Sequence, residues 1–190
     1  MEGKNNHIGH HLLSSKSLKV TLLLMLLIVI SEGRAYATES LKTRYAVIVY
    51  SGREQLEEFT ENIYLGSFSY LLRRRSPLTL KDEVSEKFDI VIERVMEILE
   101  MFPKRMSIKV VLHNDQEGVN AAYRNIYGIS TEFIAFYSPK TRELHLSLND
   151  LNLHVLAHES AHAVIDHYFG VAPPTKIHEV LAQYVEEHID

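Results

Sequence analysis

The 190-residue chain contains no cysteine and only 8 glycines and 5 prolines. The absence of cysteine excludes a disulfide scaffold and every zinc or iron–sulfur site that needs thiolate ligands, so any metal must be bound by His, Asp or Glu. The low glycine and proline content, together with 46% hydrophobic and 24% charged residues, argues against a disordered or fibrous chain. The composition is that of a globular protein, and the length suits one domain.

The first 37 residues show the order of features that is typical of a secretory signal peptide. Lys16 and Lys19 precede an apolar run at 20–30, and a small-x-small motif ends at Ala37. We therefore predict that residues 1–37 are a signal peptide cleaved after Ala37. The alternative is a signal-anchor, but eleven helical residues span only about 16 Å, roughly half of the hydrocarbon thickness. We expect a secreted, periplasmic or cell-envelope protein with no stable membrane span.

Acidic side chains outnumber basic ones in the mature chain that this cleavage predicts. Residues 38–190 carry 16 basic and 23 acidic side chains, a formal charge of −7. A surface of this sign does not attract phosphate backbones, which argues against nucleic acid as a partner. The basic run at 73–75 is interpreted as a solvated loop, with a processing site or a patch for an anionic partner as alternatives.

Residues 38–190 contain no internal repeat, low-complexity tract or flexible linker, which predicts a single domain. Apolar periodicity predicts strands at 44–50 and 107–113, helices at 53–64, 81–101 and 116–125, and a connection at 68–79. The strand at 44–50 is apolar on both faces, and both faces are therefore expected to be covered.

A β-hairpin and two helices are predicted for the rest of the chain. The hairpin strands are expected at 132–137 and 143–148, and the helices at 150–169 and 176–188, with a break at Gly170 and at the proline pair 173–174. The predicted fold is α+β, with a small mixed or antiparallel sheet and two helices that close the chain.

Seven of the eleven histidines lie in the last 46 residues, and two of them form an H-E-x-x-H sequence within the helix predicted at 150–169. Because residues four apart lie above one another on a helix, His158 and His162 can point at a common ion. Glu159, one step round the helix, can face water at that ion and act as general base. The alternative is a solvated helix face that is rich in histidine.

A third ligand has to come from outside this helix, because one helix face cannot close three sides of a tetrahedron. Glu179 is the first candidate, since it stands 17 residues after His162 on the next predicted helix. His178, His154 and Asp166 are the competing donors. His154 and Asp166 lie on the same row as the two histidines, where they stack above or below them. His178 points about 100° away from Glu179, so only one of these two can face the ion.

The segment from Leu144 to Glu187 resembles the gluzincin metallopeptidases, the thermolysin-like class, and in size it is most similar to their compact single-domain relatives, the minigluzincins. The resemblance rests on the strand 144–148, on the stretch LAHESAH at 156–162, and on EVLAQY at 179–184, where Val180 replaces the glycine that is common in the family. It covers about a quarter of the chain.

The resemblance implies a zinc ion (Zn²⁺) bound by His158, His162 and Glu179, with Glu159 as general base in the hydrolysis of peptide bonds by a metal-activated water. It also implies a Tyr or His that stabilises the tetrahedral oxyanion. Tyr184 is our first candidate for this role, and Tyr168 and His178 are the alternatives.

In the resembling family an extended peptide pairs with the edge strand beside the zinc helix. Here the expected partner of a peptide or protein substrate is one strand of the hairpin at 132–148, most naturally the strand from Glu143 to Leu148. The alternative is a covered hairpin without substrate contact. The leading hypothesis is an exported zinc metallopeptidase. One alternative is a metal-stabilised binding module of the same fold in the cell envelope, without turnover. The other is a helical envelope interaction protein without metal.

Overall fold

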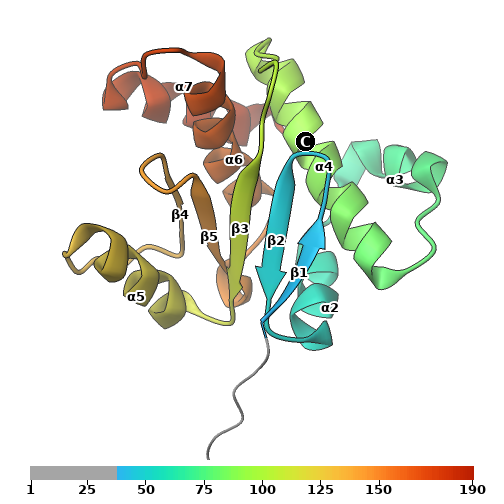
Figure 1. Ribbon diagram of the computed structural model, residues 1–190. Coiled ribbons are helices and arrows are strands. Elements are labelled where there is room, and N and C mark those ends of the chain that lie inside the picture. The colour runs from blue at the N-terminus through green and yellow to red at the C-terminus, as the bar shows by residue number, and fades with distance from the viewer. Residues whose placement is uncertain (1–37) are drawn as a thin grey trace, which may run out of the picture. The chain divides into compact units, whose positions relative to one another are not determined.

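The computed structural model describes residues 38–190, which form a five-stranded mixed sheet and its surrounding helices (Figure 1). The prediction of an α+β fold with two closing helices is confirmed, and of the two predicted sheet types, mixed or antiparallel, the sheet is mixed. The predicted signal peptide at 1–37 lies outside the described residues. Within the part of the chain that is described, no helix combines the length and apolarity needed to cross a membrane.

Each strand and helix that the sequence predicts is present, with ends that differ by a few residues. The strands are β1 (Glu39–Lys42), β2 (Ala46–Tyr50), β3 (Ile108–His113), β4 (Ala135–Ser138) and β5 (Glu143–Ser147). The α-helices are α2 (Arg53–Asn62), α3 (Ser69–Arg75), α4 (Leu80–Leu99), α5 (Gln116–Tyr127), α6 (Leu153–Tyr168) and α7 (Thr175–His188), and the 3₁₀ turns are η2 (Gly66–Phe68) and η3 (Leu148–Asp150). The sequence patterns did not predict β1 or α3.

The strands are ordered β1-β2-β3-β5-β4 across the sheet. β2, β3 and β5 are parallel, and the two edge strands, β1 and β4, are antiparallel to their neighbours. β5 is thus hydrogen-bonded to β3 on one side and to β4 on the other. The prediction that the strand from Glu143 to Leu148 offers a free edge to a substrate is therefore wrong, and β4 is the edge strand on this side of the sheet.

The two faces of the sheet are covered by different helices. Leu144 and Leu146 of β5 belong to the main hydrophobic core, which they share with Ala157 and Ala161 of α6 and with the buried side of α4. On the other face, α5 contacts β3, β4 and β5. Val47 and Val49 of β2 are partly exposed, so only one face of β2 is fully buried, contrary to the prediction.

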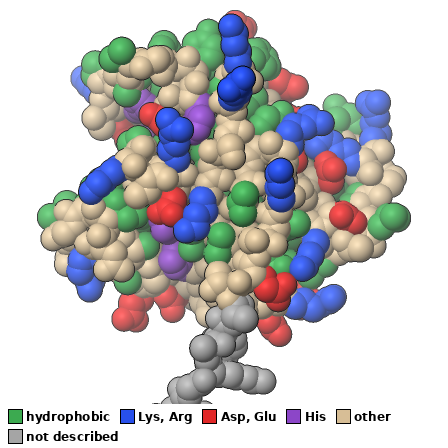
Figure 2. Space-filling view, viewed as in Figure 1, with side chains coloured by type: hydrophobic (Ala, Val, Ile, Leu, Met, Phe, Trp, Pro, Cys, Tyr) green, Lys and Arg blue, Asp and Glu red, His purple; other side chains and the backbone are tan. Residues whose placement is uncertain are grey.

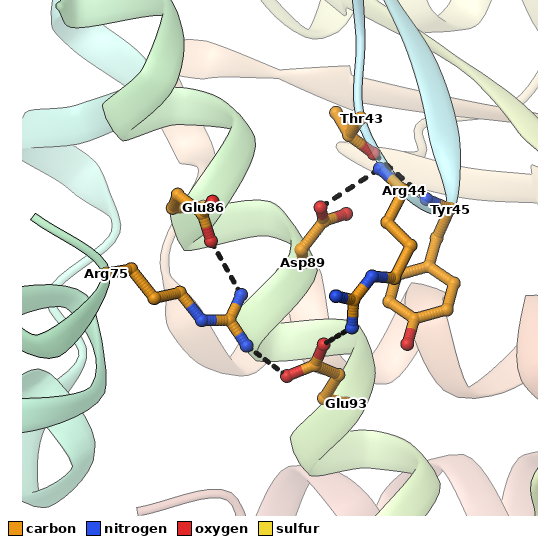
Figure 3. Close-up of polar contacts among 7 residues, drawn as sticks. All are labelled: Thr43, Arg44, Tyr45, Arg75, Glu86, Asp89 and Glu93. Atoms are coloured by element: carbon orange, nitrogen blue, oxygen red, sulfur yellow. Dashed lines mark hydrogen bonds and ion pairs between the residues drawn. The ribbon is translucent and has the colours of Figure 1, made fainter. Parts of the chain in front are cut away.

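Basic and acidic side chains are interspersed over the face of the protein shown in Figure 2. A cluster of basic and acidic side chains fixes α4 to the turn between β1 and β2 (Figure 3). The buried carboxylate of Asp89 accepts a hydrogen bond from the backbone N–H of Arg44 at 3.0 Å. Glu93 pairs with both Arg44 and Arg75, and Arg75 also pairs with Glu86 at 2.7 Å. The basic run at 73–75 is thus the end of α3 and not a solvated loop.

Candidate metal centre

Helix α6 carries the H-E-x-x-H sequence and is fixed at its start by a side-chain cap. The amide oxygen of Asn152 accepts a hydrogen bond from the backbone N–H of Val155 at 3.0 Å. The small side chains of Ala157 and Ala161 are fully buried in the core. The helix also packs against α7, and α7 brings Glu179 to the two histidines.

We expect Asn152→Ala to lower the free energy of unfolding by about 1 kcal/mol, because an N-cap acceptor satisfies a backbone N–H that has no partner inside the helix. Urea unfolding of the two proteins measures this difference. Asn152→Asp is the matched control, since its carboxylate can accept the same bond, and its stability should stay close to that of the wild type. Equal stability of the Ala and Asp variants would contradict the role of the cap.

The side chains of His158, His162 and Glu179 come together at one point between α6 and α7. One ligand atom from each residue lies within 4.8 Å of the other two. Glu179 Oε2 is 3.7 Å from His158 Nε2, and Glu179 Oε1 is 3.7 Å from His162 Nε2. Ligand atoms at tetrahedral corners around zinc are about 3.4 Å apart, so only small movements would bring these three to a shared ion. The residues present therefore fit a zinc site.

The two histidines are prepared for metal binding in different ways. Burial, with His158 and His178 nearby, lowers the pKa of His162 to about 4, so its imidazole is neutral near pH 7 and free to ligate. His158 Nδ1 is 2.9 Å from Glu186 Oε2, which leaves Nε2 directed at Glu179. A carboxylate in this position orients a metal-binding imidazole. Sequence reasoning missed Glu186, although it lies two turns after Glu179 on the same side of α7.

Glu159 lies beside the three candidate ligands and points toward the edge strand. Its carboxylate accepts a hydrogen bond from the backbone N–H of Tyr137 in β4 at 2.8 Å. Burial raises the pKa of Glu159 to about 7, against the opposing effects of His158 and of the Tyr137 N–H. The predicted general base is thus close to the predicted metal site and is not one of the three ligands.

A cleft of about 670 Å³ gives access to these residues. It is bounded by β4, the end of α5, α6 and the start of α7, and its lining includes His158, Glu159, His162 and Glu179. Figure 2 shows histidine and acidic side chains together between α7 and the β4–β5 hairpin. The candidate site is therefore open to a ligand from outside.

The other proposed third ligands are occupied elsewhere or lie beside the site. His154 Nδ1 is 2.9 Å from the backbone oxygen of Glu186. Asp166 accepts a hydrogen bond from Tyr137 Oη at 2.8 Å. The ring of His178 lines the cleft and is stacked on that of His162 at 5.9 Å. Among the predicted donors it is Glu179 that meets both histidines.

The structure gives Tyr184 no place at the site for which it was proposed. Its ring is half exposed, stacks on His188 at 4.2 Å and does not line the cleft. Tyr184 follows Glu179 by five residues, which corresponds to a rotation of about 140° around the helix axis. This rotation explains why Tyr184 points away from the candidate site. Tyr168 does not line the cleft either, and His178 is the one of the three predicted oxyanion donors that does.

Comparison with models of protein families, with curated proteins and with solved structures finds no match.

Proposed function

We propose that this protein is an exported zinc-dependent peptidase of the gluzincin type. The observation that carries the proposal is the meeting of His158, His162 and Glu179 within 4.8 Å, from two helices and at one side of an open cleft. Glu159 beside them supplies the carboxylate that such a site needs.

The donor set supports zinc as the metal. Two imidazoles and one carboxylate are the protein ligands of one group of catalytic zinc sites, in which a fourth position stays open. When bound there, zinc supplies a Lewis acid that polarises a peptide carbonyl and lowers the pKa of water. His158, His162 and Glu179 hold the ion in this proposal, and Glu186 holds the ring of His158 in place.

Glu159 acts as the general base. Its carboxylate takes a proton from the attacking water and later gives one to the leaving amine nitrogen. The Tyr137 N–H holds one of its oxygens at 2.8 Å, which fixes the side chain at the floor of the cleft. His178, whose ring also lines the cleft, is the group that we assign to stabilise the oxyanion.

The position of β4 as the outermost strand of the described sheet supports an extended peptide as substrate. Ser147 donates a backbone hydrogen bond to Ile134 at 2.9 Å, and the antiparallel register continues through Phe136 and His145. This alternation turns the backbone groups of Ala135 and Tyr137 away from β5. Since the Tyr137 N–H meets Glu159, this edge faces the candidate site. An added peptide strand would bring its backbone close to the ligand residues, whatever its side chains.

Metal analysis and peptide digestion test the proposal. Protein purified without chelator should contain about one zinc per chain and cleave peptides in a mixed library, and removal of the metal should abolish cleavage until zinc is restored. His162→Ala should lose the zinc. His154→Ala, one turn before His158 on α6, should keep it. Bound zinc without any cleavage would favour the metal-stabilised binding module, and absence of zinc would favour the interaction protein.

A further inference from the structure

One part of the cleft is lined by aromatic side chains that the proposed chemistry does not use. Two come from α5, one from the loop before β4 and one from β4, and we call them together the aromatic wall: Tyr123, Tyr127, Phe133 and Phe136. They line the same cavity as the three metal-binding candidates. A side chain of a peptide bound along β4 is therefore within reach of them.

The rings of the aromatic wall are arranged around Tyr123. Its ring meets Phe133 edge to face at 5.0 Å and Phe136 edge to face at 5.0 Å, and it contacts the Tyr127 ring at 4.6 Å. Separations and orientations of this kind are the favourable ones for aromatic pairs. A further ring that enters the cleft can extend the cluster with the same geometry.

The aromatic wall is held from behind by packing and hydrogen bonds. Phe136 is buried and stacks on His145 at 4.7 Å. Tyr127 Oη is 2.8 Å from Ser138 Oγ, which joins the end of α5 to β4. Because these contacts hold Tyr127 and Phe136 in place before a ligand arrives, these side chains lose little conformational entropy when an aromatic ring of the ligand binds.

Phe133 is the member of the wall that packing does not explain. Phe133 is 44% exposed although its ring contacts Tyr123, and it is one of the residues that line the cleft. The charged groups in the cleft are acidic, with Glu159, Asp166 and Glu179, and no Lys or Arg lines the cleft among the described residues. The aromatic wall is therefore suited to an uncharged ring and not to an acidic side chain.

We infer that the aromatic wall is a specificity subsite that selects an aromatic side chain of the bound peptide over an aliphatic one. This inference rests on the proposed function in taking a peptide as the ligand. An aromatic pair adds about 0.5 to 1.5 kcal/mol beyond the burial of apolar area. A peptide with Phe at the matching position should bind about three- to tenfold more tightly than the same peptide with Leu, and both should bind more tightly than the Ala peptide.

Binding to zinc-loaded Glu159→Gln protein, measured by titration calorimetry, tests the inference without turnover. The probes are alanine-rich octapeptides in which one position carries Phe, Leu, Ala or Glu, with that position moved along the peptide. Phe133→Leu in the same background keeps an apolar side chain but removes the ring, and it should abolish the preference for Phe over Leu. Phe102→Leu is the matched control, because Phe102 is 62% exposed and does not line the cleft, and it should keep the preference.

The outcomes separate the subsite from the proposed function. A preference for Phe that Phe133→Leu removes supports the subsite, even if wild-type protein cleaves none of the peptides and the peptidase proposal fails. The subsite is overturned if Leu and Phe peptides bind equally well, or if Phe133→Leu keeps the preference for Phe. Cleavage of peptides by the wild-type protein would then leave the peptidase proposal standing. Absence of binding for every peptide overturns the subsite as well.

Discussion

Replacement of Glu159 by Gln is expected to lower kcat/KM for peptide hydrolysis by about 10²- to 10⁴-fold while about one zinc per chain stays bound, since general acid–base groups contribute that much to rate. The amide has the size of the carboxylate, and its oxygen can still accept the hydrogen bond from the Tyr137 N–H. It cannot take a proton from water. Zinc should be retained because Glu159 is not among the three residues that meet at the candidate site.

The comparison needs hydrolysis rates, zinc content and unfolding temperature on the same preparations. Glu187→Gln is the matched control, because Glu187 is exposed and does not line the cleft, and it should change neither rate nor zinc content. A Glu159→Gln protein that cleaves peptides as fast as the wild type would show that Glu159 is not the base. In that case the observed hydrolysis has another source, and the binding module becomes the better explanation of the site.

The elements that could be predicted are those whose sequence pattern is set by burial against the core. The length and phase of α4 follow from apolar residues at three- and four-residue intervals. Nine residues of the helix are buried, and seven of these are apolar. Helix α3 has no buried residue, so its sequence, SYLLRRR, shows no such pattern. Strand β1 has only four residues, and its pairing with β2 rather than its own apolar content defines it.

The order of strands could not be predicted from local patterns. The β4–β5 hairpin was expected because its two strands follow one another closely in the sequence. Pairing of β5 with β3 joins Lys109 to Glu143, whose side chains form an ion pair at 2.9 Å. The whole of α5 separates the two strands in sequence, and the local pattern of neither strand predicts this distant contact. This distant pairing occupies the second edge of β5 and explains why the edge strand was assigned to the wrong half of the hairpin.

In the candidate site, too, the part on one helix could be predicted from the sequence and the part that depends on the order of strands could not. His158, Glu159 and His162 have fixed relative positions because one helix carries them, and Glu179 required only that α7 pack against α6. Tyr137 lies 22 residues from Glu159 in sequence, and the hydrogen bond between them depends on where the edge strand lies. The phase of α7 alone places Tyr184 about 140° from Glu179, so the helix geometry is sufficient to predict that Tyr184 points away from the site.

Glu179→Ala is expected to weaken zinc binding by more than about 100-fold, and Glu186→Gln by about 10- to 100-fold, because loss of a ligand costs more than loss of the group that orients one. Glu179 is 3.7 Å from each histidine Nε2, whereas the carboxylate of Glu186 lies 2.9 Å from Nδ1 of His158. The two carboxylates thus act on opposite nitrogens of the same ring. Competition with a chromogenic chelator gives both affinities.

Equal losses in the two variants would mean that Glu186 itself ligates the ion, which requires the His158 ring to turn over. A Glu179→Ala protein with wild-type zinc affinity would remove the third ligand and with it the main support for the peptidase. His178→Ala tests whether His178 is a metal ligand or an oxyanion-stabilising group. A group that stabilises the oxyanion should affect kcat for peptide hydrolysis and leave the zinc affinity from the chelator competition unchanged. The loss of zinc affinity should therefore be largest for the Glu179 variant, smaller for the Glu186 variant and absent for the His178 variant. This order follows from the geometry only if the ion lies between α6 and α7, where His158, His162 and Glu179 meet.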